Sequence, residues 1–359
     1  MASIPNLNTL RTGRRGPRRR GGGQKAFPTG QDVPHSDAED SESARDKAIQ
    51  QTDQDASSSR ASAVALGYLE DPFVELFLPP GENAPKRFPI INRGTYVRTR
   101  AIDELTRRFL RRDDGTRKQV VSLGAGSDTR FFRFVTAQAD FAPSGLEYHE
   151  LDFAANVAEK RRIIAASTDL SACITRAQRA DIFYRLHAID LRDIPTTSPP
   201  EIPDFDPALP TLLLSECCLC YLSPDVAEGV LRYFVDRVRS SLALVLYEPI
   251  QPADAFGRTM VANLASRGIH LRTLQRFASS DAQRVRLREA GLTDGQGARD
   301  VRQLWESEEW VGSEERERVE RLEWLDEVEE WNLLASHYCV AWGWKGQLFS
   351  QAWEGLSGG

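Results

Sequence analysis

The spacing of hydrophobic and polar positions changes along the chain and divides it into parts. Residues 1–50 hold few large apolar side chains, so they cannot bury enough surface to offset the entropy of ordering and are predicted to be disordered. Apolar residues at helical spacing follow, first over 55–67, then in a short helix after Asp71, then over 92–112. Residues 51–117 are therefore predicted to form an N-terminal helical cap.

From residue 118 the pattern changes to short apolar runs separated by helical stretches. These runs are predicted strands, at 119–123, 148–152, 187–191, 211–216 and 242–248. Apolar strands that alternate with helices are typical of a parallel sheet covered on both faces. Residues 118–250 are therefore predicted to form a Rossmann-like α/β core.

The remaining residues are predicted to add to this core. Residues 251–312 contain helical stretches without strong strands, which indicates a helical lid or substrate region. Residues 316–335 have the pattern of one acidic amphipathic helix, and 337–344 that of a strand. We therefore expect residues 313–345 to complete the core, and 346–359 to be a tail.

Composition and charge narrow the class of protein. Of the 359 residues, 41% are hydrophobic and 27% charged, as in globular proteins. The formal net charge is −6, although residues 1–30 carry seven basic side chains and no acidic one, so the body is acidic and poorly suited to duplex nucleic acid. No run approaches the ~20 apolar residues of a membrane span. We expect a cytoplasmic (alternatively nuclear) monomer without membrane contact, in which only the basic tail could meet nucleic acid.

The cysteines indicate a reducing compartment rather than a disulfide framework. Their number is odd, and three of them lie together in an apolar run, which is typical of buried thiols. No second cluster of cysteine or histidine accompanies this run, so we expect no metal site. The five cysteines are Cys173, Cys217, Cys218, Cys220 and Cys339.

A glycine turn follows the first predicted strand. Gly124 and Gly126 let the backbone approach a ligand without an obstructing Cβ. The turn continues with Ser127 and Asp128, so the third glycine of the pyrophosphate-binding GxGxxG motif is missing. A nicotinamide-dependent dehydrogenase is therefore disfavoured.

Acidic residues end the next predicted strands. A carboxylate such as Asp152 accepts hydrogen bonds from a ribose diol, and Asp190 with Leu191 suits an adenine. Glu216 ends an apolar strand, where an unpaired buried carboxylate costs several kcal/mol, so it must face a cleft or a cation. Helix capping or an ion pair explains Asp152 or Glu216 alone equally well. Together, at the ligand-binding edge of a parallel sheet, they favour S-adenosyl-L-methionine.

The segment 121–130, Val-Ser-Leu-Gly-Ala-Gly-Ser-Asp-Thr-Arg, resembles the LGAGxDT motif of the leucine carboxyl methyltransferases. Further segments similar to the family occur before and after it, in the family's order, over residues 52–345. Among them are Asp71-Pro72, Asn92-Arg-Gly94 and Phe256-Gly-x-x-Met260. The family methylates the C-terminal leucine of the protein phosphatase 2A catalytic subunit. The resemblance implies that activity and partner, S-adenosyl-L-methionine as cofactor, and a class I methyltransferase fold with a helical cap and an inserted lid.

Two other functions remain open from the sequence. The LGAGxDT motif also occurs in small-molecule O-methyltransferases, so a small-molecule carboxylic acid is the alternative substrate. A module that binds the cofactor without chemistry is disfavoured, because Arg98, Asp152 and Glu216 are all present.

The resemblance also implies which residues bind the cofactor: Arg60, Arg98, Gly124, Asp152, Asp190, Leu191 and Glu216. Arg98 can hold the methionyl carboxylate in a bidentate fork, or else form a surface ion pair with Asp103 or Glu104. Arg60 would assist from the N-terminal helix, and Glu216 would hold the methionyl amine.

Candidate substrate-binding residues follow from the substrate class. A C-terminal carboxylate has a pKa of about 3.3–3.7, so it is ionised at neutral pH and requires no general base. The enzyme must instead position it. Tyr221 and Tyr247 are the candidate hydroxyls for that role, and packing in the core is the alternative.

Overall fold

The structure is a computed structural model that describes residues 35–79, 81, 86–111, 115–136, 145–326 and 328–356. Seven strands form one sheet in the order β3-β2-β1-β4-β5-β7-β6. They are β1 (Lys118–Leu123), β2 (Leu146–Asp152), β3 (Ile182–Ala188), β4 (Thr211–Glu216), β5 (Leu242–Pro249), β6 (Gly295–Asp300) and β7 (Tyr338–Lys345). Only β7 runs in the opposite direction to the other six strands. The order reverses between β1 and β4, where α/β sheets open a crevice for ligands.

Helices cover both faces of the sheet, as expected from its apolar strands. Alternate residues of β1 and β4 belong to two separate hydrophobic cores, one on each face. The first core includes α2 (Pro89–Arg111), α3 (Arg130–Thr136) and α5 (Thr168–Arg179), and the second includes α6 (Pro224–Arg237) and α8 (Ser280–Glu289). The helix α4 (Ala154–Ala166) packs against β3 and α5.

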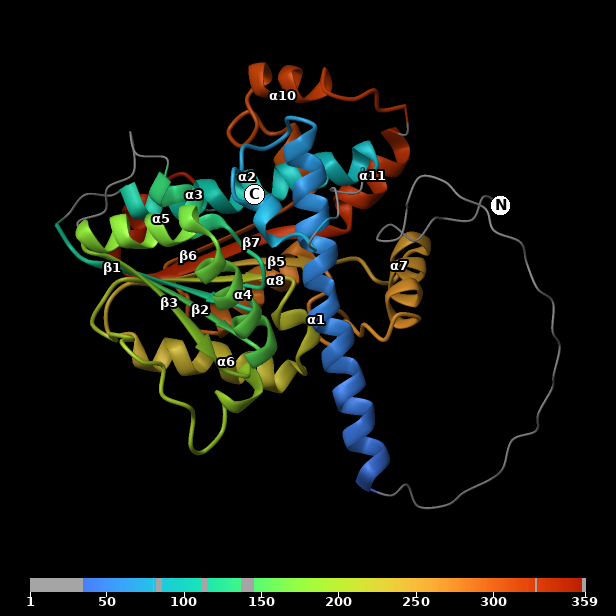
Figure 1. The fold of residues 1–359 in the computed structure, drawn as a ribbon. Helices are drawn as coiled ribbons and strands as arrows, with labels where there is room; N and C mark the ends of the chain where they lie inside the picture. The colour runs from blue at the N-terminus through green and yellow to red at the C-terminus, as the bar shows by residue number, and fades with distance from the viewer. Residues whose placement is uncertain are drawn as a thin grey trace.

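The N-terminal helix α1 (His35–Ala65) is longer than expected. The disorder predicted over 1–50 is wrong for residues 35–50, while residues 1–34 lie outside the described residues. Few apolar residues hold this first half of α1, which extends beyond the body in Figure 1, so hydrophobic spacing gave no signal for it. The helix ends at Ala65, and the predicted stop at Gly67 lies in the turn that follows, where a φ of +80° suits glycine. The short helix after Asp71 is η1 (Val74–Phe77).

The third strand lies earlier than predicted. It was expected at 187–191, but β3 spans Ile182–Ala188 at the edge of the sheet, with half-buried polar residues such as Arg185. An edge strand of this kind lacks a continuous apolar run. Asp190 and Leu191 therefore lie beyond the strand, at the start of the short helix η2 (Leu191–Asp193).

The predicted lid at 251–312 is wrong for its second half. Both α8 and β6 belong to the sheet layers, followed by α9 (Val301–Glu306). The hydrophobic pattern did not predict β6 because the strand contains Gly295 and Gly297. Glycine is required at both positions, since a Cβ would come within 2.2 and 2.3 Å of the rings of Trp344 and Trp342. This leaves α7 (Ala255–Ala265) and the segment after it as the part outside the sheet layers.

The C-terminal region also differs from its prediction. Instead of one helix over 316–335 there are two, α10 (Ser313–Glu320) and α11 (Val328–Ser336). Residues 346–359 are not a loose tail as far as they are described, since α12 (Gln347–Ala352) packs on α2. There Phe349 stacks on Phe109 with centroids 4.6 Å apart, and Trp353 Nε1 donates to the Leu105 carbonyl.

All five cysteines are free, and three of them are buried. Within the described residues, no group of three metal-ligating side chains occurs. Nor does any described helix combine the length and apolar character required to cross a membrane.

Candidate active site

A cavity of about 340 Å³ opens at the carboxyl ends of the parallel strands. Residues of α1, α2, α7 (Ala255–Ala265) and α11 (Val328–Ser336) also line it. All nine residues predicted from the sequence line this cavity, although they come from seven different stretches of the chain. They are Arg60, Arg98, Gly124, Asp152, Asp190, Leu191, Glu216, Tyr221 and Tyr247.

The turn after β1 brings backbone to the cavity. Gly124 has a φ of +64°, and a Cβ there would lie 2.5 Å from the Cys218 sulfur, so only glycine fits. The next glycine, Gly126, donates its backbone N–H to Asp152 Oδ2 at 2.7 Å. Asp152 Oδ1 accepts from Asn156 at 2.8 Å. Burial raises the pKa of Asp152, and these hydrogen bonds hold the carboxylate in place at the cavity wall.

Beyond the end of β3, Asp190 is connected to α1 through an arginine. Asp190 accepts from the Arg192 guanidinium at 2.6 Å, and Arg192 also pairs with Asp46 at 2.7 Å and Glu42 at 2.9 Å. Both α1 acids lie in the stretch expected to be disordered. The sequence therefore predicted Asp190 but not its connection to the N-terminal helix.

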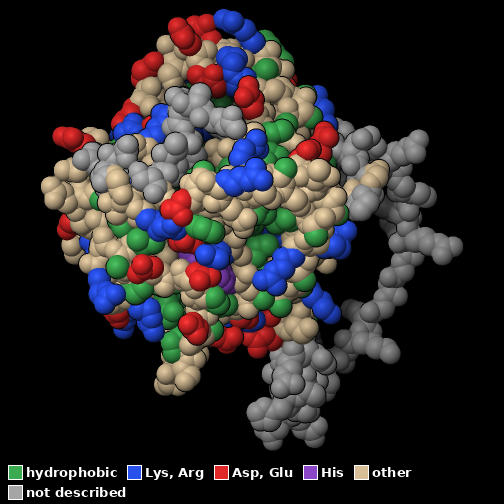
Figure 2. Space-filling view, turned by 60° about the vertical axis from the view of Figure 1, so that its left-hand side comes forward, with side chains coloured by type: hydrophobic (Ala, Val, Ile, Leu, Met, Phe, Trp, Pro, Cys, Tyr) green, Lys and Arg blue, Asp and Glu red, His purple; other side chains and the backbone are tan. Residues whose placement is uncertain are grey.

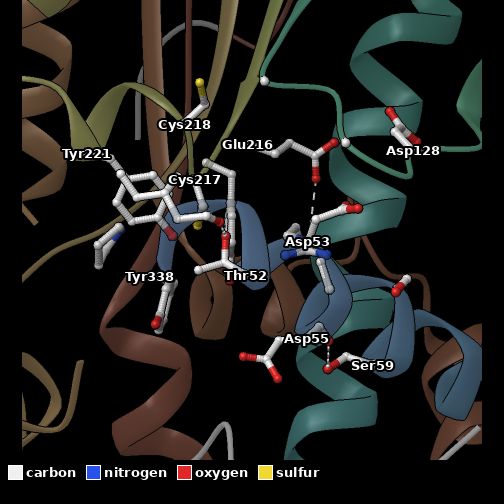
Figure 3. Close-up of a pocket in the computed structure, with 18 of the residues that line it drawn as sticks. Thr52, Asp53, Asp55, Ser59, Asp128, Glu216, Cys217, Cys218, Tyr221 and Tyr338 are labelled. Carbon is white, nitrogen blue, oxygen red and sulfur yellow. Dashed lines mark hydrogen bonds and ion pairs between the residues drawn. The ribbon is translucent and has the colours of Figure 1, made fainter. Parts of the chain in front are cut away.

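Glu216 lies between two arginines. Its Oε1 binds Arg130 at 2.7 Å, and its Oε2 lies 3.5 Å from Arg98 Nε. The Arg98 guanidinium also lies over the Tyr247 ring, 5.0 Å from its centroid. Figure 3 shows Glu216 pointing into the cavity. The sequence predicted that Glu216 faces a cleft or a cation, because it ends an apolar strand. In the structure it has both, the cavity and the two arginines.

The alternative partners of Arg98 are engaged elsewhere. Asp103 is buried and binds Arg130 and Arg133, whose charges hold its pKa below the usual range. Glu104 pairs with Arg108 at 2.9 Å. Arg98 is thus directed into the cavity rather than along the surface of α2.

The second predicted arginine, Arg60, comes from α1. Its Nη1 lies 3.5 Å from Asp71 Oδ2 and its Nη2 donates to Thr99 at 3.3 Å. Burial lowers the pKa of Arg60. Both Arg60 Nη1 and Arg98 Nε are buried without a hydrogen-bond partner. Because buried polar atoms are nearly always satisfied, these two donors fit a ligand carboxylate in the cavity.

Tyrosine side chains also line the cavity. Figure 3 shows Tyr221, Tyr338 and Thr52 near one another. Tyr221 hydrogen-bonds Thr52, and Tyr247 stacks on Tyr338 with centroids 5.5 Å apart. Burial raises the pKa of Tyr221 and of Tyr247, so both hydroxyls are protonated donors at neutral pH.

The sequence reasoning missed part of this lining. Asp53 of α1 accepts from the backbone N–H and the hydroxyl of Ser127, at 2.8 and 2.7 Å, and so joins the helix to the glycine turn. Thr52 and Tyr338 also line the cavity. Thr52 and Tyr338 both lie in segments that resemble the family, and this resemblance could have identified them. Residue spacing alone assigned neither of them a chemical role.

The cavity is acidic overall. Six carboxylates line it, from Asp53, Asp55, Asp128, Asp152, Asp190 and Glu216, against the guanidinium groups of Arg60 and Arg98. A ligand with net positive charge complements such a lining. S-adenosyl-L-methionine meets this requirement, because its sulfonium and ammonium outweigh its one carboxylate.

The sheet order with its antiparallel seventh strand, the glycine turn after β1 and the acid ending β2 define a class I, Rossmann-like methyltransferase. Residues 48–235 match the sequence profile described as leucine carboxyl methyltransferase. The chain belongs to the leucine carboxyl methyltransferase family. This confirms the predicted fold and enzyme class, with S-adenosyl-L-methionine as methyl donor.

Individual relatives align along nearly the whole chain. A protein named leucine carboxyl methyltransferase 1 from Emericella nidulans is 50% identical, over 99% of this chain and 97% of its own. One of the same name from Aspergillus fumigatus is 49% identical, over 96% and 94%. An Arabidopsis thaliana homologue is 36% identical, over 82% and 88%.

Proposed function

We propose that this protein methylates the α-carboxyl group of the C-terminal leucine of the protein phosphatase 2A catalytic subunit and forms a leucine methyl ester. The observation that carries the proposal is the alignment, over nearly the full chain, with relatives named leucine carboxyl methyltransferase 1. The acidic cavity with its two unsatisfied arginine donors supports the same activity.

The predicted residues suit the methyl donor chemically. Arg98 and Arg60 would hold its methionyl carboxylate, since each has a buried donor without a hydrogen-bond partner. Glu216 would hold the methionyl amine and Asp152 the ribose hydroxyls. Asp190 and Leu191 would contact the adenine, and Gly124 leaves room for the ligand beside the turn.

The reaction depends on positioning rather than on proton transfer. When bound, S-adenosyl-L-methionine supplies an electrophilic methyl group on a sulfonium, which a carboxylate oxygen attacks directly. The substrate carboxylate is already ionised at neutral pH. Tyr221 and Tyr247 would hold it by hydrogen bonds from their protonated hydroxyls. Alignment of this kind is worth up to ~7–11 kcal/mol of the barrier.

The leucine side chain requires an apolar contact near these hydroxyls. Phe256, Met260 and Leu264 of α7 line the cavity together with Leu271, which follows that helix. On α11, Leu334 lines it as well. We assign these five side chains to the leucine, which narrows the predicted substrate region at 251–312 to its first part.

We further propose a monomer in the cytoplasm, with the nucleus as the alternative. Five free cysteines support a reducing compartment. Figure 2 shows acidic and basic side chains interspersed over one face, rather than the single basic stripe of a nucleic-acid-binding protein. The basic tail at 1–30 lies outside the described residues, and its contact with nucleic acid stays a prediction.

Incubation with S-adenosyl-L-methionine labelled in the methyl group tests the substrate. Phosphatase 2A catalytic subunit with its terminal leucine should take up label, and the same subunit lacking that leucine should not. Equal label on both would contradict the proposal. A small-molecule O-methyltransferase, the second candidate, would leave both unlabelled and form S-adenosylhomocysteine only with a small carboxylic acid.

A further inference from the structure

We propose that Arg130 is a positioning residue for methyl-donor binding, holding Glu216 with one oxygen fixed and the other free for the donor's ammonium. This rests on the proposed function, in which Glu216 faces the methionyl end. Arg130 does not line the cavity and was not among the residues predicted from the sequence. It follows the glycine turn directly, at the start of α3.

The Arg130 guanidinium is fully buried and binds a different carboxylate at each nitrogen. Nε lies 2.8 Å from Asp103, Nη1 2.5 Å from Asp128, and Nη2 2.7 Å from Glu216. Burial of three carboxylates around one cation is costly unless every hydrogen bond is made. A guanidinium has a fixed planar set of donors for this arrangement, whereas a lysine ammonium does not.

The two oxygens of Glu216 are held unequally. Oε1 accepts from Arg130 at hydrogen-bond distance, whereas Oε2 has a 3.5 Å ion pair with Arg98. Arg98 Nε makes no hydrogen bond there. The methionyl end of the donor carries both a carboxylate and an ammonium. If it binds between Arg98 and Glu216, its carboxylate can pair with Arg98 and its ammonium with Oε2. Two short ion pairs then replace the long one.

Arg130 holds the Glu216 carboxylate in the same position when the donor replaces the long ion pair with Arg98. Its other two partners lie in different parts of the fold, Asp103 on α2 and Asp128 in the glycine turn. The arginine therefore fixes the β4 carboxylate relative to the turn and to the helix that carries Arg98. Loss of this anchor should weaken the binding of ligands that carry an amino acid group and spare those that do not.

Calorimetric titration of Arg130→Lys with two ligands tests the proposal. S-adenosylhomocysteine has the amino acid end, and 5′-methylthioadenosine lacks it. We expect the first ligand to bind about tenfold or more weakly than to the unaltered protein, since a charge-assisted hydrogen bond is misaligned. The second should bind within about twofold. If the lysine variant fails to fold, Asp103→Asn, which weakens one anchor of Arg130 and keeps its charge, gives the same comparison.

Arg107→Lys is the matched control. Arg107 also binds Asp103, but its described partners include neither Glu216 nor Asp71, the carboxylate that pairs with Arg60, so both ligands should bind as before. An equal loss for both ligands in the Arg130 variant, or no loss for either, would overturn the proposal. Unaltered protein that binds neither ligand would overturn the donor site itself, and with it the role of Arg130.

Discussion

At the scale of residues, the charged side chains that line the cavity have partners within the protein. Arg98 and Arg60 each have a carboxylate at 3.5 Å, beyond the usual length of a charge-assisted hydrogen bond. Glu216 and Asp152, by contrast, are held by bonds of 2.7 Å. The acids are thus fixed, and the arginines have donors available for a ligand carboxylate.

Substitution of Arg98 should affect the ligand more than the fold. Arg98→Ala removes a 3.5 Å ion pair but leaves Glu216 bound to Arg130, so the free energy of unfolding should change little, whereas the fork proposed for the methionyl carboxylate is lost. Affinity for S-adenosylhomocysteine in calorimetry should fall at least about tenfold. Arg108→Ala, on the outer side of α2, should change neither quantity. Unchanged affinity in Arg98→Ala would refute the assigned role.

Gly124 should be intolerant of any side chain. Gly124→Ala meets both a left-handed backbone, at about 1–2 kcal/mol, and a contact of 2.5 Å with Cys218. Gly81→Ala is the control, because Gly81 has a φ of +78° and nothing within 4 Å of the added Cβ. Urea unfolding should show a larger loss of stability for Gly124→Ala. Equal losses would mean that the close contact costs nothing.

The buried pair of His149 and His187 gives stability a pH dependence. Their nitrogens lie 3.0 Å apart, and burial lowers the pKa of His149 to about 3 and of His187 to about 4. The unfolded chain binds protons below its ordinary pKa of about 6.5 while the folded protein does not, so stability is lost as pH falls. Glu150 acts oppositely, because burial raises its pKa to about 7.

His149→Gln separates these contributions. Between pH 7 and pH 5 the variant should lose about 2 kcal/mol less of its unfolding free energy than the unaltered protein. Urea unfolding at the two pH values measures the difference. His270→Gln, at an exposed position, should leave the dependence as it is. Parallel curves for His149→Gln and the unaltered protein would show that His149 is not held neutral by the fold.

At the scale of elements, how well the sequence predicts a segment depends on how that segment is buried. The strands β4 and β5 are buried along almost their whole length, and the predicted ranges agree with them to within a residue. The strands β3 and β6 lie at the sheet edges with mixed or glycine-rich sequences, and the apolar pattern misplaced one and missed the other. Hydrophobic spacing reports burial, so it fails where an element is half-exposed.

The candidate site followed a similar rule. Residues at strand ends, such as Asp152 and Glu216, could be found because parallel strands bring their carboxyl ends to one edge. Asp53 and Arg130 could not, because their importance comes from contacts with segments distant in the sequence. The family resemblance supplied Arg60 and Arg98, which lie on helices where spacing alone gives an arginine no role.

The C-terminal helix α12 should contribute stability without affecting the site. Trp353 is fully buried against α2, so Trp353→Ala should cost about 3–5 kcal/mol of unfolding free energy. Trp324→Ala, at a side chain with 86% of its surface exposed, should stay within about 0.5 kcal/mol. Denaturant unfolding provides the comparison. A small loss for Trp353→Ala would mean that residues 346–356 are the dispensable tail first expected.

At the scale of the whole molecule, segments from both ends of the chain meet over one edge of the sheet. The cavity is lined by α1 near the N-terminus and by β7 near the C-terminus, with the strand ends between them. The residues proposed to bind the cofactor and the apolar side chains proposed to contact the leucine thus share one cavity. We therefore expect the methyl donor and the leucine carboxylate to bind next to each other in it.

Mass spectrometry of the phosphatase C-terminal peptide tests this account most directly. After incubation with the protein and S-adenosyl-L-methionine, the account predicts one added methyl group on the terminal leucine carboxylate, removed again by mild alkali as an ester must be. The Glu216→Gln protein should add little. An unmodified C-terminal peptide, or a methyl group on another residue that survives alkali, would contradict the account.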